Sequence, residues 1–159
     1  MTILLMRHGD AVRNDGPDEA RHLSRTGRHD ALAVARALAT HLHGKRVGLV
    51  VSSHLVRAVQ TAEIVVSELT RTGTEVDPMV HADPRFEPDG SARHAAKHLE
   101  QLEATHAPSL ILCVCHEPIV RGIAAHLAPS RGAAPFATSG ICCIDRGAVL
   151  WSLDPRSLG

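Results

Sequence analysis

The chain has 159 residues, a length typical of one domain, so we expect a single domain over residues 1–159. Hydrophobic residues make up 44% of the chain and charged residues 21%, as in ordinary globular proteins and unlike disordered chains. The 17 basic residues balance the 17 acidic ones, which argues against a broad nucleic-acid-binding surface.

The first predicted element is a buried strand from Thr2 to Met6. Its residues are almost all apolar, and a strand that is covered on both faces shows such a continuous run instead of alternation. The run ends at Arg7-His8-Gly9, and in open α/β sheets ligands bind just outside the carboxyl ends of the strands. We therefore expect this guanidinium and this imidazole to lie at a functional site, where the glycine permits a close backbone approach.

The rest of the chain alternates predicted helices with predicted strands. Ser24 and Ser91 are suitable N-caps, and Gly44 and Gly73 are suitable helix ends. The expected helices cover about 25–43, 55–70, 92–106 and 118–127, and the expected strands cover 47–51, 75–81, 110–115, 141–144 and 149–153. This order predicts an α/β protein, a three-layer α/β/α sandwich with a mostly parallel central sheet.

Polar side chains follow three of the stronger strands. Arg7-His8 follows the first, Ser52-Ser53 follows the second with Arg57 one helical turn further on, and His116 follows the strand at 110–115. Because the carboxyl ends of parallel strands meet at one edge, we expect two arginines and two histidines to converge there. Such a pocket suits a tetrahedral anion, since guanidinium groups make strong bidentate hydrogen bonds to phosphate.

Three segments of the chain resemble the signature segments of the histidine phosphatase superfamily, which includes the phosphoglycerate mutases. They are Leu5-Met6-Arg7-His8-Gly9, Ser52-Ser53-His54-Leu55-Val56-Arg57-Ala58-Val59-Gln60-Thr61-Ala62 and Val114-Cys115-His116-Glu117-Pro118. The short bacterial phosphohistidine phosphatases of the SixA type, which lack the lid segments of larger members, are similar in three further places. These are Arg7-His8-Gly9-Asp10-Ala11, Arg21-x-Leu23-Ser24-x-x-Gly27 and Phe136-Ala137-Thr138-Ser139-Gly140. The resemblance implies a phosphoglycerate mutase-like fold.

The resemblance also implies a role for each of the converging residues. His8 would be the nucleophile, whose neutral imidazole attacks phosphorus to form a covalent phosphohistidine that water then hydrolyses. Arg7 and Arg57 would hold the phosphoryl oxygens, and His116 would donate a further hydrogen bond to them. Arg21 matches the pattern of the short members and is a candidate third phosphate ligand. The arginines supply the positive charge that Mg²⁺ supplies elsewhere, so we expect neither a metal nor another cofactor.

The general acid is the member of the site that the sequence leaves open. Larger family members place a glutamate in the loop after the third strand, and here that loop reads Arg85-Phe86-Glu87-Pro88-Asp89-Gly90. Glu87 is the first candidate and Asp89 the second, whereas Arg85 stands at the usual position of the acid. The lack of a firm acid favours phosphohistidine as the substrate, because a phosphoramidate nitrogen can be protonated before its bond to phosphorus breaks.

We therefore expect a phosphatase that dephosphorylates phosphohistidine on a signalling or phosphotransfer protein. An open site without a lid accepts a group displayed on another protein more readily than it encloses a small sugar phosphate. The alternatives are a broad phosphomonoesterase acting on small phosphate esters and a non-catalytic phosphate-binding adaptor. Neither a nucleic acid nor a membrane is expected as a partner.

The cysteines and the apolar runs indicate the compartment. Cys113, Cys115, Cys142 and Cys143 lie in apolar strands without C-x-x-C spacing, so we expect buried thiols and neither a disulfide nor a zinc site. Arg7 interrupts the apolar run at the amino end, and no run approaches the length of a membrane span. These features predict a cytoplasmic protein.

Overall fold

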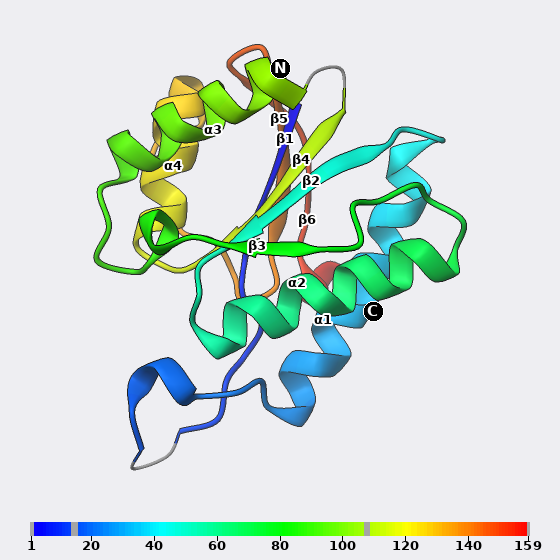
Figure 1. Ribbon diagram of the computed structural model, residues 1–159, viewed down its shortest axis with the longest axis vertical. Coiled ribbons are helices and arrows are strands. Elements are labelled where there is room, and N and C mark those ends of the chain that lie inside the picture. Colours follow the sequence, from blue (N-terminus) through cyan, green and yellow to red (C-terminus); the bar gives the residue numbers. More distant parts are fainter. Residues whose placement is uncertain (1, 14–15, 107–108, 159) are drawn as a thin grey trace.

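The structure is a computed structural model, and it describes residues 2–13, 16–106 and 109–158. Its centre is a six-stranded sheet in the order β3-β2-β4-β1-β5-β6 (Figure 1). The strands are β1 Thr2–Arg7, β2 Val47–Ser52, β3 Val80–Ala82, β4 Leu110–Cys115, β5 Ile141–Asp145 and β6 Ala148–Leu153. The neighbours β3, β2, β4 and β1 run parallel, and β5 and β6 complete the sheet as an antiparallel hairpin. The predicted mostly parallel sheet is confirmed.

Helices cover both faces of this sheet (Figure 1). Helices α1 (Arg25–Leu42) and α2 (Val56–Arg71) pack against each other on one face, and α3 (Ala92–His106) and α4 (Ile119–Leu127) do so on the other. Three 3-10 turns lie between these elements, η1 Asp18–Ala20, η2 Pro84–Phe86 and η3 Pro129–Arg131, and a fourth, η4 Pro155–Ser157, follows β6. The prediction of a three-layer α/β/α sandwich is therefore confirmed as well.

Strand β1 shows why its sequence is apolar without interruption. Ile3 and Leu5 belong to the core beneath α3 and α4, whereas Leu4 and Met6 belong to the core beneath α1 and α2. All four side chains are fully buried. Because successive side chains of a strand face opposite sides, a central strand covered by helices on both faces needs apolar residues at every position.

The predicted helix caps are present. The Ser24 hydroxyl accepts the N–H of Gly27 at 3.0 Å at the start of α1, and the Ser91 hydroxyl accepts the N–H of His94 at 3.2 Å at the start of α3. Such bonds satisfy backbone donors that the first helical turn leaves without partners.

The third strand is much shorter than the sequence suggests. Regular pairing covers only Val80–Ala82, and within the predicted range 75–81 Val76 adds a single isolated bridge to Val47. Between them, Pro78 has no N–H to donate, and the Asp77 carboxylate accepts the backbone N–H of Met79 at 3.1 Å instead of leaving it to the sheet. The local side-chain bond therefore replaces a ladder bond.

The four cysteines are buried and free, as predicted. No helix in the described part of the chain is long and apolar enough to cross a membrane. Within the same residues, no three His, Cys, Asp or Glu side chains gather in a way that could hold a metal ion.

Candidate active site

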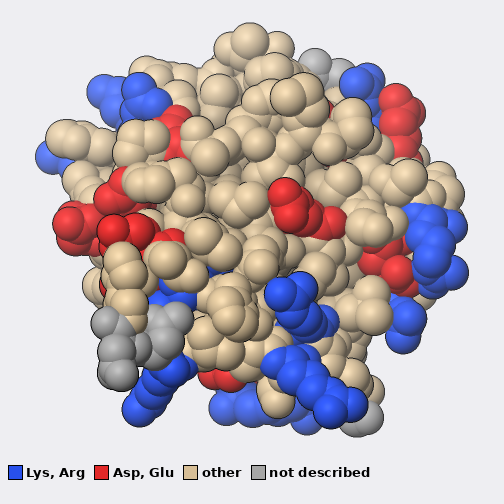
Figure 2. All heavy atoms as spheres, turned by 60° about the horizontal axis from the view of Figure 1, so that its bottom comes forward, with Lys and Arg blue, Asp and Glu red and all other residues tan. Residues whose placement is uncertain are grey.

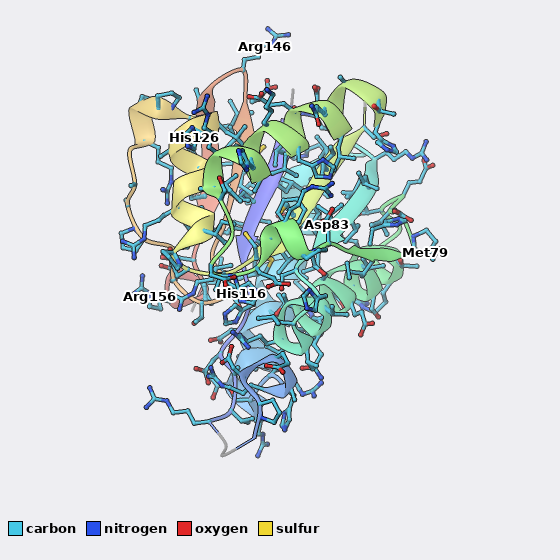
Figure 3. The ribbon with its side chains drawn as sticks, turned by 60° about the vertical axis from the view of Figure 1, so that its left-hand side comes forward. Met79, Asp83, His116, His126, Arg146 and Arg156 are labelled. Atoms are coloured by element: carbon cyan, nitrogen blue, oxygen red, sulfur yellow. The ribbon has the colours of Figure 1, made fainter. Side chains whose placement is uncertain are left out.

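The carboxyl ends of β1, β2 and β4 meet at one edge of the sheet, and His116 lies at that edge (Figure 3). His8, the first residue after β1, donates its backbone N–H to the carbonyl oxygen of Cys115 at 2.9 Å. Ser53, the first residue after β2, donates in the same way to Val114 at 3.1 Å. The rings of His8 and His116 lie with their centroids 4.8 Å apart. The structure thus brings together the two histidines that the sequence places at this edge.

One hydrogen bond determines which ring nitrogen of His8 is free. Nδ1 lies 2.6 Å from the backbone carbonyl oxygen of Gly9. A carbonyl oxygen can only accept, so Nδ1 carries the ring proton and Nε2 keeps its lone pair. The side chain is half-buried, which leaves Nε2 within reach of a substrate. Nε2 is therefore the ring nitrogen of His8 that has a free lone pair.

Gly9 is required by the close packing of this turn. A Cβ there would lie 2.9 Å from the carbonyl oxygen of Gly27 and 3.0 Å from the hydroxyl oxygen of Ser139. The N–H of Gly9 donates to the Thr61 hydroxyl on α2 at 3.0 Å. This bond ties the turn that carries His8 to the helix that carries Arg57.

Ser53 holds His116, which is fully buried. The Ser53 hydroxyl lies 2.6 Å from Nε2 of His116 and accepts the N–H of Leu55 at 3.0 Å. With Nε2 as the acceptor of the hydroxyl proton, the proton of the neutral imidazole lies on Nδ1. Nδ1 is buried and has no hydrogen-bond partner among the described residues, although buried polar atoms nearly always have one. It is therefore a donor suited to an anion beside His8.

Arg57 is almost completely buried and is held by the 3-10 turn η1. Its Nη1 donates to the backbone carbonyl oxygen of Asp18 at 2.9 Å, and its Nη2 donates to the Asp18 carboxylate at 3.1 Å. The other oxygen of the same carboxylate accepts from Nη1 of Arg21 at 3.0 Å, and Arg21 Nε donates to the Val12 carbonyl oxygen at 2.8 Å. One carboxylate therefore bridges two predicted phosphate ligands.

Arg7 is held by the segment that precedes β5. Its Nη1 donates to the carbonyl oxygen of Phe136 at 2.8 Å. The N–H of Phe136 in turn donates to the Glu117 carboxylate at 2.7 Å, and that carboxylate forms an ion pair with Arg121 at 2.7 Å. The Nε of Arg7 is buried without a hydrogen-bond partner in the described part of the chain, which makes it a second donor available to an anion.

Burial and neighbouring cations keep both histidines neutral. Burial is the largest of the causes that lower the pKa of His8 to about 4, and the charges of Arg57, Arg7 and Arg21 act in the same direction, against the opposing bond to Gly9. Burial also lowers the pKa of His116 to about 3, with His8 and Arg57 acting in the same direction. At neutral pH the free Nε2 of His8 is therefore unprotonated, as nucleophilic attack requires.

In the loop after β3, the two candidate acids Glu87 and Asp89 have different surroundings. Glu87 forms an ion pair with His54, with 2.9 Å between Oε1 and Nδ1. Asp89 is exposed, and Arg85 is engaged with the Asp83 carboxylate at 2.7 Å. The Glu87–His54 pair lies directly beside Ser53 in the chain, so the first candidate acid reaches the site edge with a histidine as its partner.

Sequence reasoning missed two carboxylates at this edge. Asp18 bridges Arg21 and Arg57, and Glu117 connects Arg121 with the backbone that holds Arg7. Both lie three or four residues from an arginine, a spacing that allows an ion pair but does not reveal a contact across the fold.

The surface at this end of the molecule carries charges of both signs. Figure 2 turns the lower end of Figure 1 forward, where Lys and Arg side chains gather along the lower rim and Asp and Glu side chains lie among the neutral ones. The opposite end of the molecule carries Arg146, far from His116 (Figure 3).

A mostly parallel sheet presents at its carboxyl edge a histidine with a free Nε2, a second neutral histidine and the arginines Arg7 and Arg57, and this arrangement fits a phosphatase of the histidine type. The family model of the histidine phosphatase superfamily (branch 1) matches residues 3–81, and the chain belongs to this superfamily. It is accordingly a phosphatase-class hydrolase.

Among individual proteins, the chain is similar to the phosphohistidine phosphatase SixA of Escherichia coli K12. The two are 28% identical over 165 residues, which cover 99% of this chain and 96% of the relative. A solved structure of the protein histidine phosphatase SixA complexed with tungstate superposes with a TM-score of 0.85 at 25% identity over the full length of both chains. A phosphoglycerate mutase from Bacillus anthracis shares the fold, with a TM-score of 0.71 at 12% identity, covering 99% of this chain and 94% of the mutase.

Proposed function

We propose that this chain removes phosphoryl groups through a covalent phosphohistidine on His8, and that its substrate is phosphohistidine on a signalling or phosphotransfer protein. The observation that carries the proposal is the free Nε2 of His8 close to the unpartnered Nδ1–H of His116. A nucleophile and a preorganised donor for charged oxygens are the main needs of phosphoryl transfer.

In the first step, Nε2 of His8 forms a bond to phosphorus while the bond from phosphorus to the leaving nitrogen or oxygen breaks. The leaving atom keeps the bonding electron pair and receives a proton. Arg7, Arg57 and the Nδ1–H of His116 hold the phosphoryl oxygens, and Arg21 adds positive charge behind Arg57. The Gly9 carbonyl oxygen, as acceptor from Nδ1–H, stabilises the positive charge that the phosphorylated ring of His8 acquires.

In the second step, water attacks the phosphorus of the phosphorylated His8. The bond from phosphorus to Nε2 breaks, its electron pair returns to the ring, and inorganic phosphate leaves. The sum of the two steps consumes one water for each phosphoryl group removed. The guanidinium groups supply the positive charge that a metal ion supplies in other phosphatases, so we expect the reaction to need no metal.

The substrate class is supported by the shape of the site and by the relatives. The His8 side chain is half-buried and not enclosed, which we take as accessible to a phosphoryl group on a folded partner. The relative from Escherichia coli is described as a phosphohistidine phosphatase, and the tungstate-bound structure as a protein histidine phosphatase. We propose that residues 1–159 act as one histidine phosphatase domain, and that the protein works in the cytoplasm, in keeping with its four free cysteines.

The test compares the wild type with His8→Ala on three substrates. The first is a protein whose histidine has been phosphorylated by phosphoramidate; the other two are the small esters phosphoserine and p-nitrophenyl phosphate. We expect the wild type to hydrolyse the phosphohistidine protein with the highest kcat/KM. We expect His8→Ala to lose turnover by at least about 10³-fold while it still binds tungstate in calorimetry. A wild-type phosphoenzyme stable to alkali and labile to acid would identify the intermediate.

Two results would overturn parts of the proposal. Efficient hydrolysis of both small esters with no action on the phosphohistidine protein would make the chain a broad phosphomonoesterase. Tungstate binding without turnover of any of the three substrates by the wild type would make it a phosphate-binding adaptor.

A further inference from the structure

The arginines and histidines placed at the phosphoryl site are unsuited to giving a proton to a leaving group. Arginine stays protonated in proteins, and His8 is the nucleophile. His116 is neutral at working pH, since burial lowers its pKa to about 3, and its Nδ1–H is committed to the phosphoryl oxygens. A proton for the leaving atom therefore has to come from a residue at the border of the site, which we call the rim.

Three of the carboxylates around the rim are committed to other partners. Asp18 bridges two arginines, whose hydrogen bonds hold its pKa below the usual value. Glu117 is paired with Arg121 at 2.7 Å. Asp10 accepts the Ser24 hydroxyl at 2.6 Å, and Ser24 caps α1. Each of these three carboxylates already accepts a hydrogen bond or forms an ion pair within the protein.

The pair formed by His54 and Glu87 differs from these carboxylates because the partner of Glu87 is an imidazole and not a guanidinium or a hydroxyl. Oε1 of Glu87 lies 2.9 Å from Nδ1 of His54, so the imidazole directs Nδ1–H at the carboxylate, and Nε2 is the ring nitrogen that does not contact Glu87. The His54 side chain is 49% exposed and that of Glu87 29% exposed, which leaves the pair accessible from solvent. Imidazole as a group gives and takes protons near neutral pH.

Two observations place this pair beside the reacting groups. His54 follows Ser53, whose hydroxyl is 2.6 Å from His116. The loop that carries Glu87 reaches the start of α4, because a Cβ on Gly90 would lie 3.0 Å from Cδ1 of Ile119, three residues after His116. The pair therefore lies near the carboxyl ends of β2 and β4, the edge of the sheet that carries His116.

We propose that His54 is the general acid and base of the reaction and that Glu87 is its positioning residue. The proposal rests on the proposed function of the site. In the first step, the imidazolium of His54 gives its Nε2 proton to the leaving atom as that atom parts from phosphorus. In the second step, the neutral imidazole takes a proton from the attacking water, which restores the imidazolium and balances the proton.

The roles predict a dependence on the leaving group. A good leaving group such as p-nitrophenolate departs with little help from an acid, whereas phenolate needs a proton, so removal of the acid costs more with the poorer leaving group. The experiment measures kcat/KM with a series of aryl phosphates from p-nitrophenyl to phenyl phosphate, and with a protein phosphorylated on histidine. The variants are His54→Gln, Glu87→Gln and the double variant.

The matched control is His81→Gln. His81 also pairs with a carboxylate, Asp77, at 2.9 Å, and its side chain is 47% exposed, but it lies on β3 outside the site. We expect His54→Gln to lose about 10²-fold with phenyl phosphate and several-fold less with p-nitrophenyl phosphate, so that the leaving-group dependence steepens. Glu87→Gln should lower kcat/KM by a smaller factor than His54→Gln. In the double variant it should add little to the loss caused by His54→Gln, because Glu87 acts through His54. His81→Gln should match the wild type across the series.

Two results would overturn the assignment: equal losses of His54→Gln across the whole series, or no loss with any substrate. A loss in Glu87→Gln that adds in full to that of His54→Gln would show that Glu87 does not act through His54. These results are distinct from failure of the proposed function, in which the wild type itself has no phosphatase activity. Tungstate binding by each variant checks that the phosphoryl site is intact.

Discussion

Single protons determine what the two site histidines can do. The Gly9 carbonyl oxygen holds the proton of His8 on Nδ1, and the Ser53 hydroxyl leaves the proton of His116 on Nδ1. The same ring nitrogen is protonated in both residues, with opposite consequences. In His8 it leaves a lone pair on Nε2, which the proposed mechanism uses for attack, and in His116 it leaves a donor that the same mechanism directs at the phosphoryl oxygens.

Ser53→Ala should disturb the second of these arrangements. Without the hydroxyl, Nε2 of His116 loses its partner and the ring proton is shared between the two nitrogens. We expect kcat to fall about tenfold, the size of one lost hydrogen bond, and nitrogen NMR to show a mixture of tautomers in place of one. Ser52→Ala is the matched control, because that hydroxyl donates only to the Ser53 carbonyl oxygen. An unchanged tautomer in Ser53→Ala would contradict the assignment.

The lowered pKa of His8 makes stability depend on pH. Between about pH 6.5 and 4 the unfolded chain takes up a proton at His8 and the folded chain does not, so the free energy of unfolding decreases as the pH falls through this window. His8 contributes up to about 3 kcal/mol to this decrease. Urea denaturation at several pH values should give a shallower decrease for His8→Asn than for the wild type. Parallel curves for the two proteins would argue that His8 keeps an ordinary pKa.

At the scale of an element, the turn η1 contacts two of the proposed phosphate ligands, Arg57 and Arg21. It is three residues long and exposed, yet it holds Arg57 through a backbone carbonyl oxygen and through the Asp18 carboxylate. A phosphoryl group that approaches Arg57 and Arg21 meets a carboxylate already bonded to both. Two like-charged groups then compete for the same donors.

Asp18→Asn should relieve that competition. The backbone bond to Arg57 remains, whereas the negative charge is removed, so we expect inorganic phosphate to bind about fivefold more tightly. Calorimetry with phosphate measures the effect, and Glu19→Gln, an exposed carboxylate on the same turn, controls for net charge. Weaker binding in Asp18→Asn would mean that the carboxylate positions the arginines for phosphate and does not compete with it.

At the scale of the whole molecule, the site joins segments that are far apart in the chain. Its groups come from the ends of β1, β2 and β4, from η1 and from the segment before β5, and they meet only in the folded state. An anion bound there is held by the native protein alone. Binding should therefore stabilise the fold as a unit.

Phosphate or tungstate at about 100 times its Kd should contribute about 2.7 kcal/mol and raise the Tm by roughly 5–10 °C. Differential scanning calorimetry with and without the anion measures the shift. Arg57→Ala should abolish it, and Arg146→Ala, which removes an arginine at the opposite end of the molecule, should preserve it (Figure 3). An equal shift in all three proteins would indicate general anion effects on the surface.

The sequence by itself determined the layers, the helix caps and the groups at the strand ends. Continuous apolar runs indicate strands buried on both faces, and parallel strands bring their carboxyl ends to one edge, so Arg7, His8 and His116 could be placed together from order and spacing alone. The strand predicted from the sequence at 75–81 was too long, because Pro78 and the side-chain hydrogen bond of Asp77 interrupt the pairing despite a favourable strand composition.

Only the tertiary structure decided the partners of those groups. The bridge from Asp18 to Arg57, the bond from Ser53 to His116 and the pairing of Glu87 with His54 join residues separated by 33 to 63 positions in the chain. Side-chain orientation across such separations depends on packing of the whole fold, and no local spacing encodes it. The sequence placed His8 and His116 at strand ends, and the packed fold determined which ring nitrogen of each carries the proton.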